Sequence, residues 1–164
     1  KLRRGEIARA SISDMVWYED EELMSKYNKI GDYQERADFL QKNKPDEIFI
    51  QHGLITLNEN IDWNDNECIR SIFKVKSADT LKGAIAHELG HIIHACSSPY
   101  KFIAFGLQKP DDISQEVSDY ATSNKNEFVA EYIGGRLEGK NYSSKITALY
   151  REYGGPNLFN DWEE

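Results

Sequence analysis

Apolar residues in the first quarter of the chain recur at three- and four-residue spacing, the period of an amphipathic helix. The residues that set this pattern are Ile12, Met15, Val16, Leu23, Met24 and Tyr27. A polar break at residues 28–32 separates this helix from a second one over residues 33–40. Pro45 ends the helical stretch because proline removes a backbone donor and clashes with the preceding turn. Residues 1–43 are therefore predicted to form N-terminal helices.

The pattern changes to short, β-branched runs after residue 44. Residues 48–50 and 54–57 are predicted to be strands bounded by turn-forming residues. Residues 69–75 are predicted to form a third strand, with Ile69, Ser71, Phe73 and Val75 on one face and Arg70, Ile72 and Lys74 on the other. Its edge could pair with an extended peptide. An acidic, asparagine-rich loop at residues 58–67 precedes it. We expect residues 44–76 to form a small mixed sheet.

The rest of the chain, residues 77–164, has mainly helical periodicity. Its strongest helix is predicted at residues 78–96, with Asp79 or Ser77 as the cap. The apolar stripe of this helix consists of Leu81, Ile85, Leu89 and Ile92. The pattern after it predicts a loop at 97–110, a short helix or irregular segment at 113–120, and helices at 124–137 and 143–153.

Helices, then strands, then helices indicate an α+β fold, and 164 residues suit a single domain over residues 1–164. The chain begins without Met and shows no signal peptide, so we expect a domain excised from a longer protein and leave its compartment open. A formal net charge of −8 argues against a nucleic-acid partner. No apolar run reaches membrane-spanning length. Cys68 and Cys96 are expected to be unpaired thiols.

One segment carries a specific chemical signal: His-Glu-Leu-Gly-His at residues 87–91. His87 and His91 lie one helical turn apart, so both imidazoles can reach one Zn²⁺ ion. Glu88 lies at the edge of the same face, where it can accept a proton from an activated water. Gly90 is expected to keep the helix slim where a substrate approaches. Within an apolar helix this motif predicts a catalytic zinc site.

Zinc usually takes three protein ligands, so a third must come from elsewhere. His94 lies too far along the same helix to close the site and is expected to be a second-shell or solvent-facing residue. His52 is expected to be packed or exposed. Glu127 and Glu131 are the better candidates, but Asn124 with Glu127 also forms a capping-box pattern. From residue chemistry alone, either glutamate could be the ligand, and Glu131 could instead orient a histidine.

A resemblance bears on this choice. The motif at residues 87–91, together with Val-Ser-Asp-Tyr-Ala at 117–121 and Asn-x-x-Glu-Phe-x-Ala-Glu at 124–131, resembles the lethal-factor-type zincins. That group includes the anthrax lethal factor protease domain, the Pro-Pro endopeptidases and C-terminal domains of phage minor head and toxin proteins. The resemblance implies that Glu127 is the third ligand and that Tyr120 faces the zinc-bound water or the transition-state oxyanion. Lys125 stands where the family often has proline, a mild loss.

These features predict a zinc-dependent endopeptidase acting on a peptide or protein substrate. Glu88 is expected to be the general base, and Tyr120 the second catalytic group. The alternatives are a structural or binding module of a phage or mobile-element protein that keeps a zincin fold, and a metal-dependent hydrolase with a non-peptide substrate. The aromatic-rich loop at 97–110 is expected either to cap the cleft or to pack in the core.

Overall fold

The computed structural model describes residues 7–74, 76–77 and 79–160, and all structural statements below concern this part of the chain. Two strands and seven α-helices, with two short 3-10 helices, make up the fold, which confirms the α+β class. The elements in chain order are β1 (Ala8–Trp17), α1 (Glu21–Asn28), α2 (Tyr33–Lys42), β2 (Glu47–Leu57), α3 (Asn66–Phe73), α4 (Leu81–Ser97), α5 (Pro99–Ala104), η1 (Asp112–Glu116), η2 (Tyr120–Thr122), α6 (Lys125–Leu137) and α7 (Ser144–Glu152).

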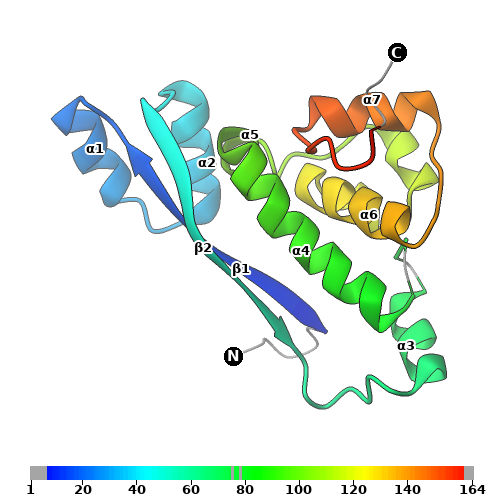
Figure 1. Cartoon of the computed structure of the whole chain (residues 1–164). Coiled ribbons are helices and arrows are strands. Elements are labelled where there is room, and N and C mark those ends of the chain that lie inside the picture. Colours follow the sequence, from blue (N-terminus) through cyan, green and yellow to red (C-terminus); the bar gives the residue numbers. More distant parts are fainter. Residues whose placement is uncertain (1–6, 75, 78, 161–164) are drawn as a thin grey trace.

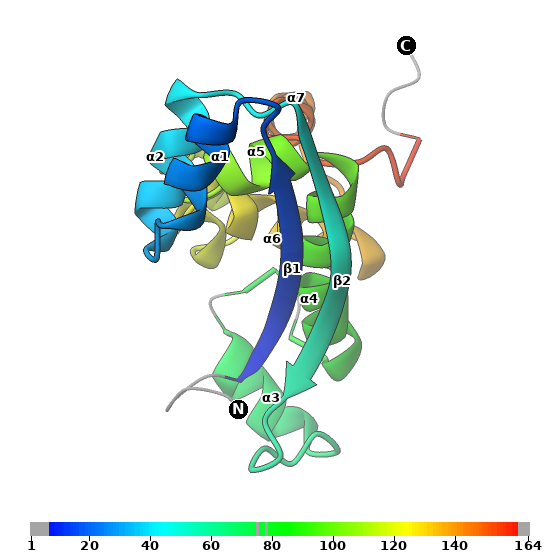
Figure 2. The same ribbon diagram turned by 90° about the vertical axis from the view of Figure 1, so that its left-hand side faces the viewer.

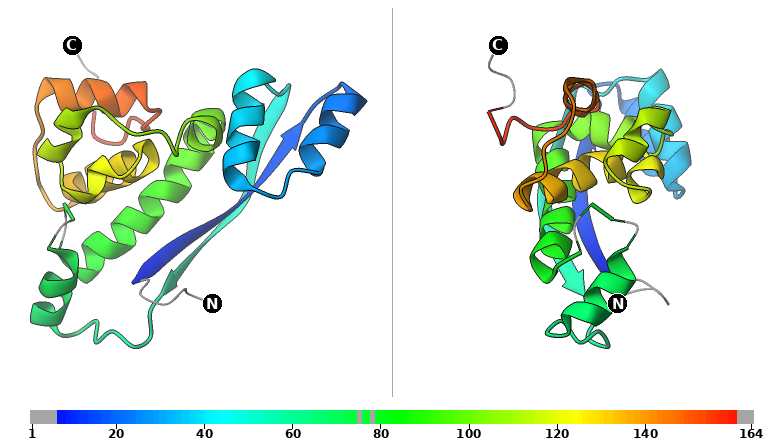
Figure 3. Two further views of the ribbon diagram at one scale, coloured as in Figure 1. Left: turned by 180° about the vertical axis from the view of Figure 1, so that it is seen from behind. Right: turned by 90° about the vertical axis from the view of Figure 1, so that its right-hand side faces the viewer.

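The long helix α4 forms the centre of the fold. The β1–β2 pair packs along one side of it, and α6 crosses its other side with α7 beyond (Figure 1; Figure 3). Gly90 lies against α6, because a Cβ at this position would lie 3.1 Å from the Cα of Ala130. The expectation that Gly90 faces an approaching substrate is therefore wrong. Its lack of a side chain instead lets α4 and α6 touch.

The first predicted helix, from about residue 7 to the break at 28, is wrong in its first part, which is strand β1, and is confirmed in its second part as α1. β1 pairs antiparallel with β2, with an irregularity at Ser13 and Asp14, and α1 and α2 fill the connection between the two strands (Figure 2). Ile12 and Val16 are four residues apart, a spacing that suits one face of a strand as well as one face of a helix. The second predicted helix is confirmed as α2.

The predicted mixed sheet over residues 44–76 is also wrong, since the sheet has two antiparallel strands. The two expected strands at 48–57 are one continuous strand, β2, and Gly53 within it lies against Ile92 of α4. The expected strand at 69–75 is instead helix α3, as far as residue 73, and Val75 falls outside the described residues. Asp65 caps α3 by accepting the backbone N–H of Glu67 at 2.9 Å.

The C-terminal helices agree with the prediction. Asn124 caps α6 and Ser143 caps α7. Helix α4 begins later than expected, with Thr80 rather than Asp79 or Ser77 as its cap, and its predicted apolar stripe is the more exposed side. The loop expected at 97–110 contains α5, whose Phe102 and Ile103 are buried, so this segment belongs to the core.

Two larger apolar clusters and one small one hold these elements together. One lies around α6 and α7 and includes Phe128, Tyr132 and Tyr150, while the other joins the sheet to α1, α2 and α5 through Val16 and Leu40. A small third cluster packs α3 against α4. None of the described helices is both long and apolar enough to cross a membrane.

Candidate metal centre

Helix α4 directs His87 and His91 toward α6. Their ring centroids are 4.9 Å apart, with the ring planes perpendicular. The His87 side chain is 5% exposed and that of His91 12% exposed, although both residues are polar. Polar groups at such depth require partners. These partners come from the facing surface of α6.

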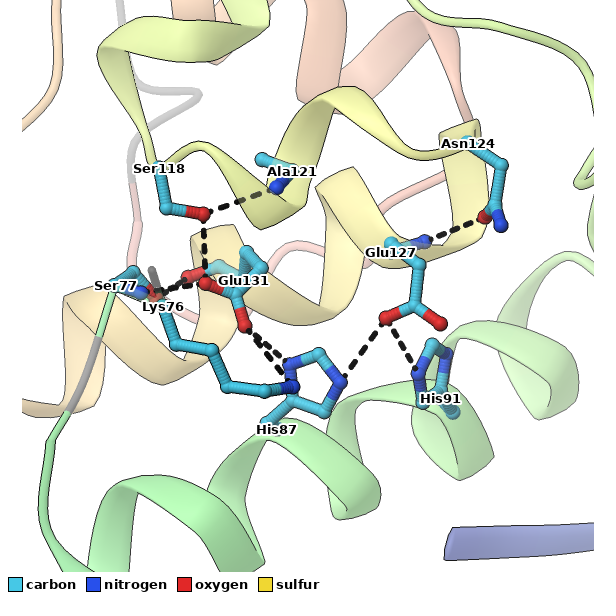
Figure 4. A network of polar contacts seen from close by, with 9 residues as sticks. All are labelled: Lys76, Ser77, His87, His91, Ser118, Ala121, Asn124, Glu127 and Glu131. Atoms are coloured by element: carbon cyan, nitrogen blue, oxygen red, sulfur yellow. Dashed lines mark hydrogen bonds and ion pairs between the residues drawn. The ribbon is translucent and has the colours of Figure 1, made fainter. Parts of the chain in front are cut away.

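Glu127, in the first turn of α6, contacts both histidines through one oxygen (Figure 4). Its Oε2 lies 3.1 Å from His87 Nε2 and 3.3 Å from His91 Nε2. Asn124 accepts the backbone N–H of Glu127 at 2.9 Å, as a helix cap should. The Glu127 carboxylate, however, points at the histidines, so only half of a capping box forms.

Glu131, one turn further along α6, contacts the other nitrogen of the same histidine. Its Oε1 lies 2.6 Å from His87 Nδ1. Its Oε2 accepts the backbone N–H of Ser77 at 2.5 Å and the hydroxyl of Ser118 at 2.8 Å. Glu131 is 1% exposed. The two hydrogen bonds to its Oε2 connect it to the segment before α4 and to the turn before η2. The two glutamates that the sequence left as alternatives therefore occupy opposite sides of His87.

His87, Glu127 and Glu131 each change the pKa values of their neighbours. Burial disfavours the charged form of His87, but Glu127 and Glu131 outweigh it and raise the pKa of the imidazole to about 9. Burial likewise opposes ionisation of both glutamates, yet contact with the histidines holds their pKa values below the usual range. Both carboxylates are therefore charged at neutral pH. A buried pocket of this kind attracts cations, and a divalent ion could replace the proton on His87.

Glu88 is 7% exposed and lies close to both histidines. One ligand-type atom from each of His87, Glu88 and His91 falls within 4.8 Å of the others. Glu88 is therefore placed to be either a third ligand or a base beside the ligands. Glu127, whose Oε2 contacts both imidazoles, is the other candidate for the third ligand.

Tyr120 borders the same pocket. Its ring centroid lies 5.9 Å from that of His87. The Lys76 ammonium stands 3.8 Å from the centroid of the Tyr120 ring and 3.9 Å from Glu131 Oε1. Burial, followed by Glu127, Glu88 and Glu131, raises the pKa of the Tyr120 phenol, so it stays protonated at neutral pH. No role at this site was predicted for Lys76, Ser77 or Ser118, because no spacing rule links them to the histidines.

The other histidines lie outside the cluster. His94 is 1% exposed and its Nε2 lies 2.9 Å from the carbonyl oxygen of Tyr153, so the solvent-facing alternative is wrong. This contact, with that of its ring on Phe102, places His94 in the core, and its second-shell role stays a prediction. His52 is exposed on β2, and Cys68 and Cys96 are free, as expected.

A comparison of the chain with protein-family models, curated proteins and solved structures found no match. The geometry of the residues themselves therefore carries the functional argument.

Proposed function

We propose that the protein is a zinc-dependent endopeptidase of the lethal-factor zincin type, with His87, His91 and Glu127 as the metal ligands. The observation that carries this proposal is the convergence of two imidazole nitrogens and one carboxylate oxygen from two different helices. Tetrahedral zinc with bonds of about 2.0–2.1 Å separates its ligand atoms by roughly 3.3 Å. The 3.1 and 3.3 Å contacts of Glu127 Oε2 match that spacing.

The donor set also fits zinc in its chemistry. Two imidazoles and one carboxylate are a common ligand set of catalytic zinc, whereas Ca²⁺ and Mg²⁺ prefer oxygen ligands alone. Glu127 Oε2 is buried and has no partner in normal hydrogen-bond geometry, as suits an atom that faces a metal ion. His87 Nδ1 is also buried and has no partner in normal hydrogen-bond geometry. Glu131 Oε1 lies 2.6 Å from this nitrogen, so a small tilt of the imidazole ring would let Nδ1–H donate to it.

The residues around the ion would divide the reaction between them. A bound zinc ion supplies a Lewis acid that polarises a carbonyl and lowers the pKa of water to about 7. Glu88 takes a proton from the attacking water and returns it to the leaving amine. Tyr120, protonated at neutral pH, donates a hydrogen bond to the oxyanion. Glu131 keeps the His87 ring in orientation.

Strand β1 supports an extended peptide as the substrate. The segment expected to offer an edge is helix α3 as far as residue 73, but β1 packs along α4 and pairs with β2 on one edge only within the described residues. A free strand edge beside the ligand helix can pair with substrate backbone. A peptide bound in this way would lie along the helix that carries His87 and His91.

Cleavage of a proteome-derived peptide library tests the proposal. The zinc-loaded protein should cleave it, a chelator should stop cleavage, and Glu88→Ala should keep zinc while losing about 10²–10⁴ in rate. Glu35→Ala, which removes an exposed carboxylate on α2, is the control and should behave as wild type. Full activity of Glu88→Ala would contradict the proposal. Bound zinc without cleavage by the wild type would instead favour a structural or binding module.

A further inference from the structure

The ends of β1 and β2 next to α1 carry large apolar side chains on the surface. Met15 pairs with Phe49 across the strands, and Trp17 pairs with Glu47. Met15, Phe49 and Trp17 are 39%, 44% and 49% exposed, whereas Val16 between them is 3% exposed. Because side chains alternate along a strand, Val16 points into the core and the three exposed side chains share the outer face.

These three side chains line a hollow of about 490 Å³, together with the acidic residues Glu19, Asp46 and Glu47. Asp46 is fixed in place, because its Oδ2 accepts the backbone N–H of Glu19 at 2.9 Å. No described lysine or arginine forms an ion pair with any of the three carboxylates. Trp17 and Glu19 also border a neighbouring hollow of about 520 Å³, whose lining includes both Glu21 and Lys29. In the first hollow, the exposed indole therefore stands beside three carboxylates without an ion-pair partner among the described residues.

We propose that this hollow, named here the β-end hollow, is a docking site for an arginine-containing peptide segment of a partner protein. A guanidinium group can stack on the indole face of Trp17 while it pairs with a carboxylate, and apolar neighbours of the arginine can cover Met15 and Phe49. The negative rim selects against acidic partners. A second copy of this chain, with net charge −8, would bring the same rim against itself.

The β-end hollow is separate from the candidate metal centre. It is lined by residues at the ends of β1 and β2 near α1, while the histidines lie on α4 and contact Glu127 on α6. Figure 1 shows these elements in different parts of the fold. The proposal therefore stands whether or not the chain is a peptidase.

Binding of a designed probe tests it. The probe is a fluorescent nine-residue amidated peptide of alternating leucine and arginine, and its counterpart carries neutral citrulline in place of each arginine. Both are titrated into the Glu88→Ala protein, which prevents cleavage of the probe. The arginine peptide should bind saturably, and the citrulline peptide about tenfold more weakly. Raising the salt concentration from about 50 to 300 mM should weaken binding of the arginine peptide several-fold.

Variants locate the site on the surface. Trp17→Ala and Glu47→Lys should each weaken binding of the arginine peptide by about fivefold or more. Leu54→Ala, at a position on β2 that is 60% exposed, and Glu35→Lys, with the same charge change on α2, should bind as the parent does. Circular dichroism checks that each variant is folded.

Three results would overturn the proposal. The first is equal binding of the two peptides, and the second is no binding of either. The third is a loss of arginine-peptide affinity in the control variants that is as large as the loss in Trp17→Ala. Sedimentation that shows a dimer dissolved by Trp17→Ala would replace the peptide with a second copy as the occupant.

Discussion

Glu131 Oε1 lies 2.6 Å from His87 Nδ1, so a carboxylate on α6 orients an imidazole on α4. Ser77 and Ser118 hold the other oxygen of the same carboxylate. The orientation of His87 therefore depends on three separate segments of the chain. A histidine that binds a metal through Nε2 needs such a partner at Nδ1 to fix its tautomer and ring angle.

Replacing Glu131 should weaken zinc binding without removing a ligand. We expect Glu131→Gln to lower zinc affinity about 10- to 100-fold, since the amide is a poorer acceptor for the imidazole proton. Competition with a chromophoric chelator measures this affinity. Glu152→Gln, at an exposed position on α7, is the matched control. Equal affinities of the two variants would show that Glu131 does not support the site.

Lys76 should act through Tyr120. Its ammonium lies 3.8 Å from the centroid of the Tyr120 ring, and the Lys76 side chain is 13% exposed. We expect Lys76→Met to lower kcat about tenfold with little change in KM, and Lys76→Arg to recover part of the loss. In a Tyr120→Phe background, Lys76→Met should lower kcat by a smaller factor, because Lys76 is expected to act through the Tyr120 ring. Additive losses in the double variant would contradict this coupling.

Gly90 should be sensitive to any side chain. A Cβ there would lie 3.1 Å from the Ala130 backbone and 3.4 Å from Ile133, so α4 and α6 must separate slightly to admit it. We expect Gly90→Ala to lower the free energy of unfolding by about 1–3 kcal/mol, measured by urea denaturation of the metal-free protein. Gly31→Ala is the control, because a Cβ added at residue 31 would have no other atom within 4 Å. A Gly90→Ala protein as stable as this control would mean that the helices do not pack so closely.

Acid should destabilise the protein partly through His94. Burial lowers the pKa of this imidazole from 6.5 to about 4 in the folded state. Between these values the unfolded chain binds more protons, so the stability contributed by neutral His94 is complete above pH 6.5 and is lost as the pH falls toward 4. Urea denaturation from pH 7 to 4.5 should therefore give a shallower pH dependence for His94→Gln than for the wild type. His52→Gln, at an exposed position, is the control, and identical slopes for the wild type and His94→Gln would refute the assignment.

The C-terminal half of the fold could be predicted because its local signals agree with each other. Asn124 and Ser143 cap helices whose apolar spacing continues without a break. The N-terminal half could not, since Ile12 and Val16 fit both a strand and a helix. Residues 69–73 showed the converse ambiguity: Ile69 and Phe73 fit an alternating strand and also one face of a helix. In the structure this segment is helical, and Ile69 packs against Ala84 on α4.

The candidate site was predictable to a similar degree. The four-residue spacing of His87 and His91 placed both rings on one face, as found. Glu127 and Glu131 also share one face of a helix, so sequence spacing alone could not separate their roles. Lys76 and Ser77 reach the site from the segment before α4, through contacts that depend on tertiary structure. No periodic pattern in the sequence predicts such contacts.

The central claim is that His87, His91 and Glu127 together hold one zinc ion. Anomalous diffraction at the zinc absorption edge, from crystals of the zinc-loaded protein, tests it most directly. We predict a single peak about 2.0–2.2 Å from His87 Nε2, His91 Nε2 and a Glu127 oxygen, with Glu88 beyond bonding distance. A peak that contacts Glu88 in place of Glu127, or no peak between α4 and α6, would contradict the account.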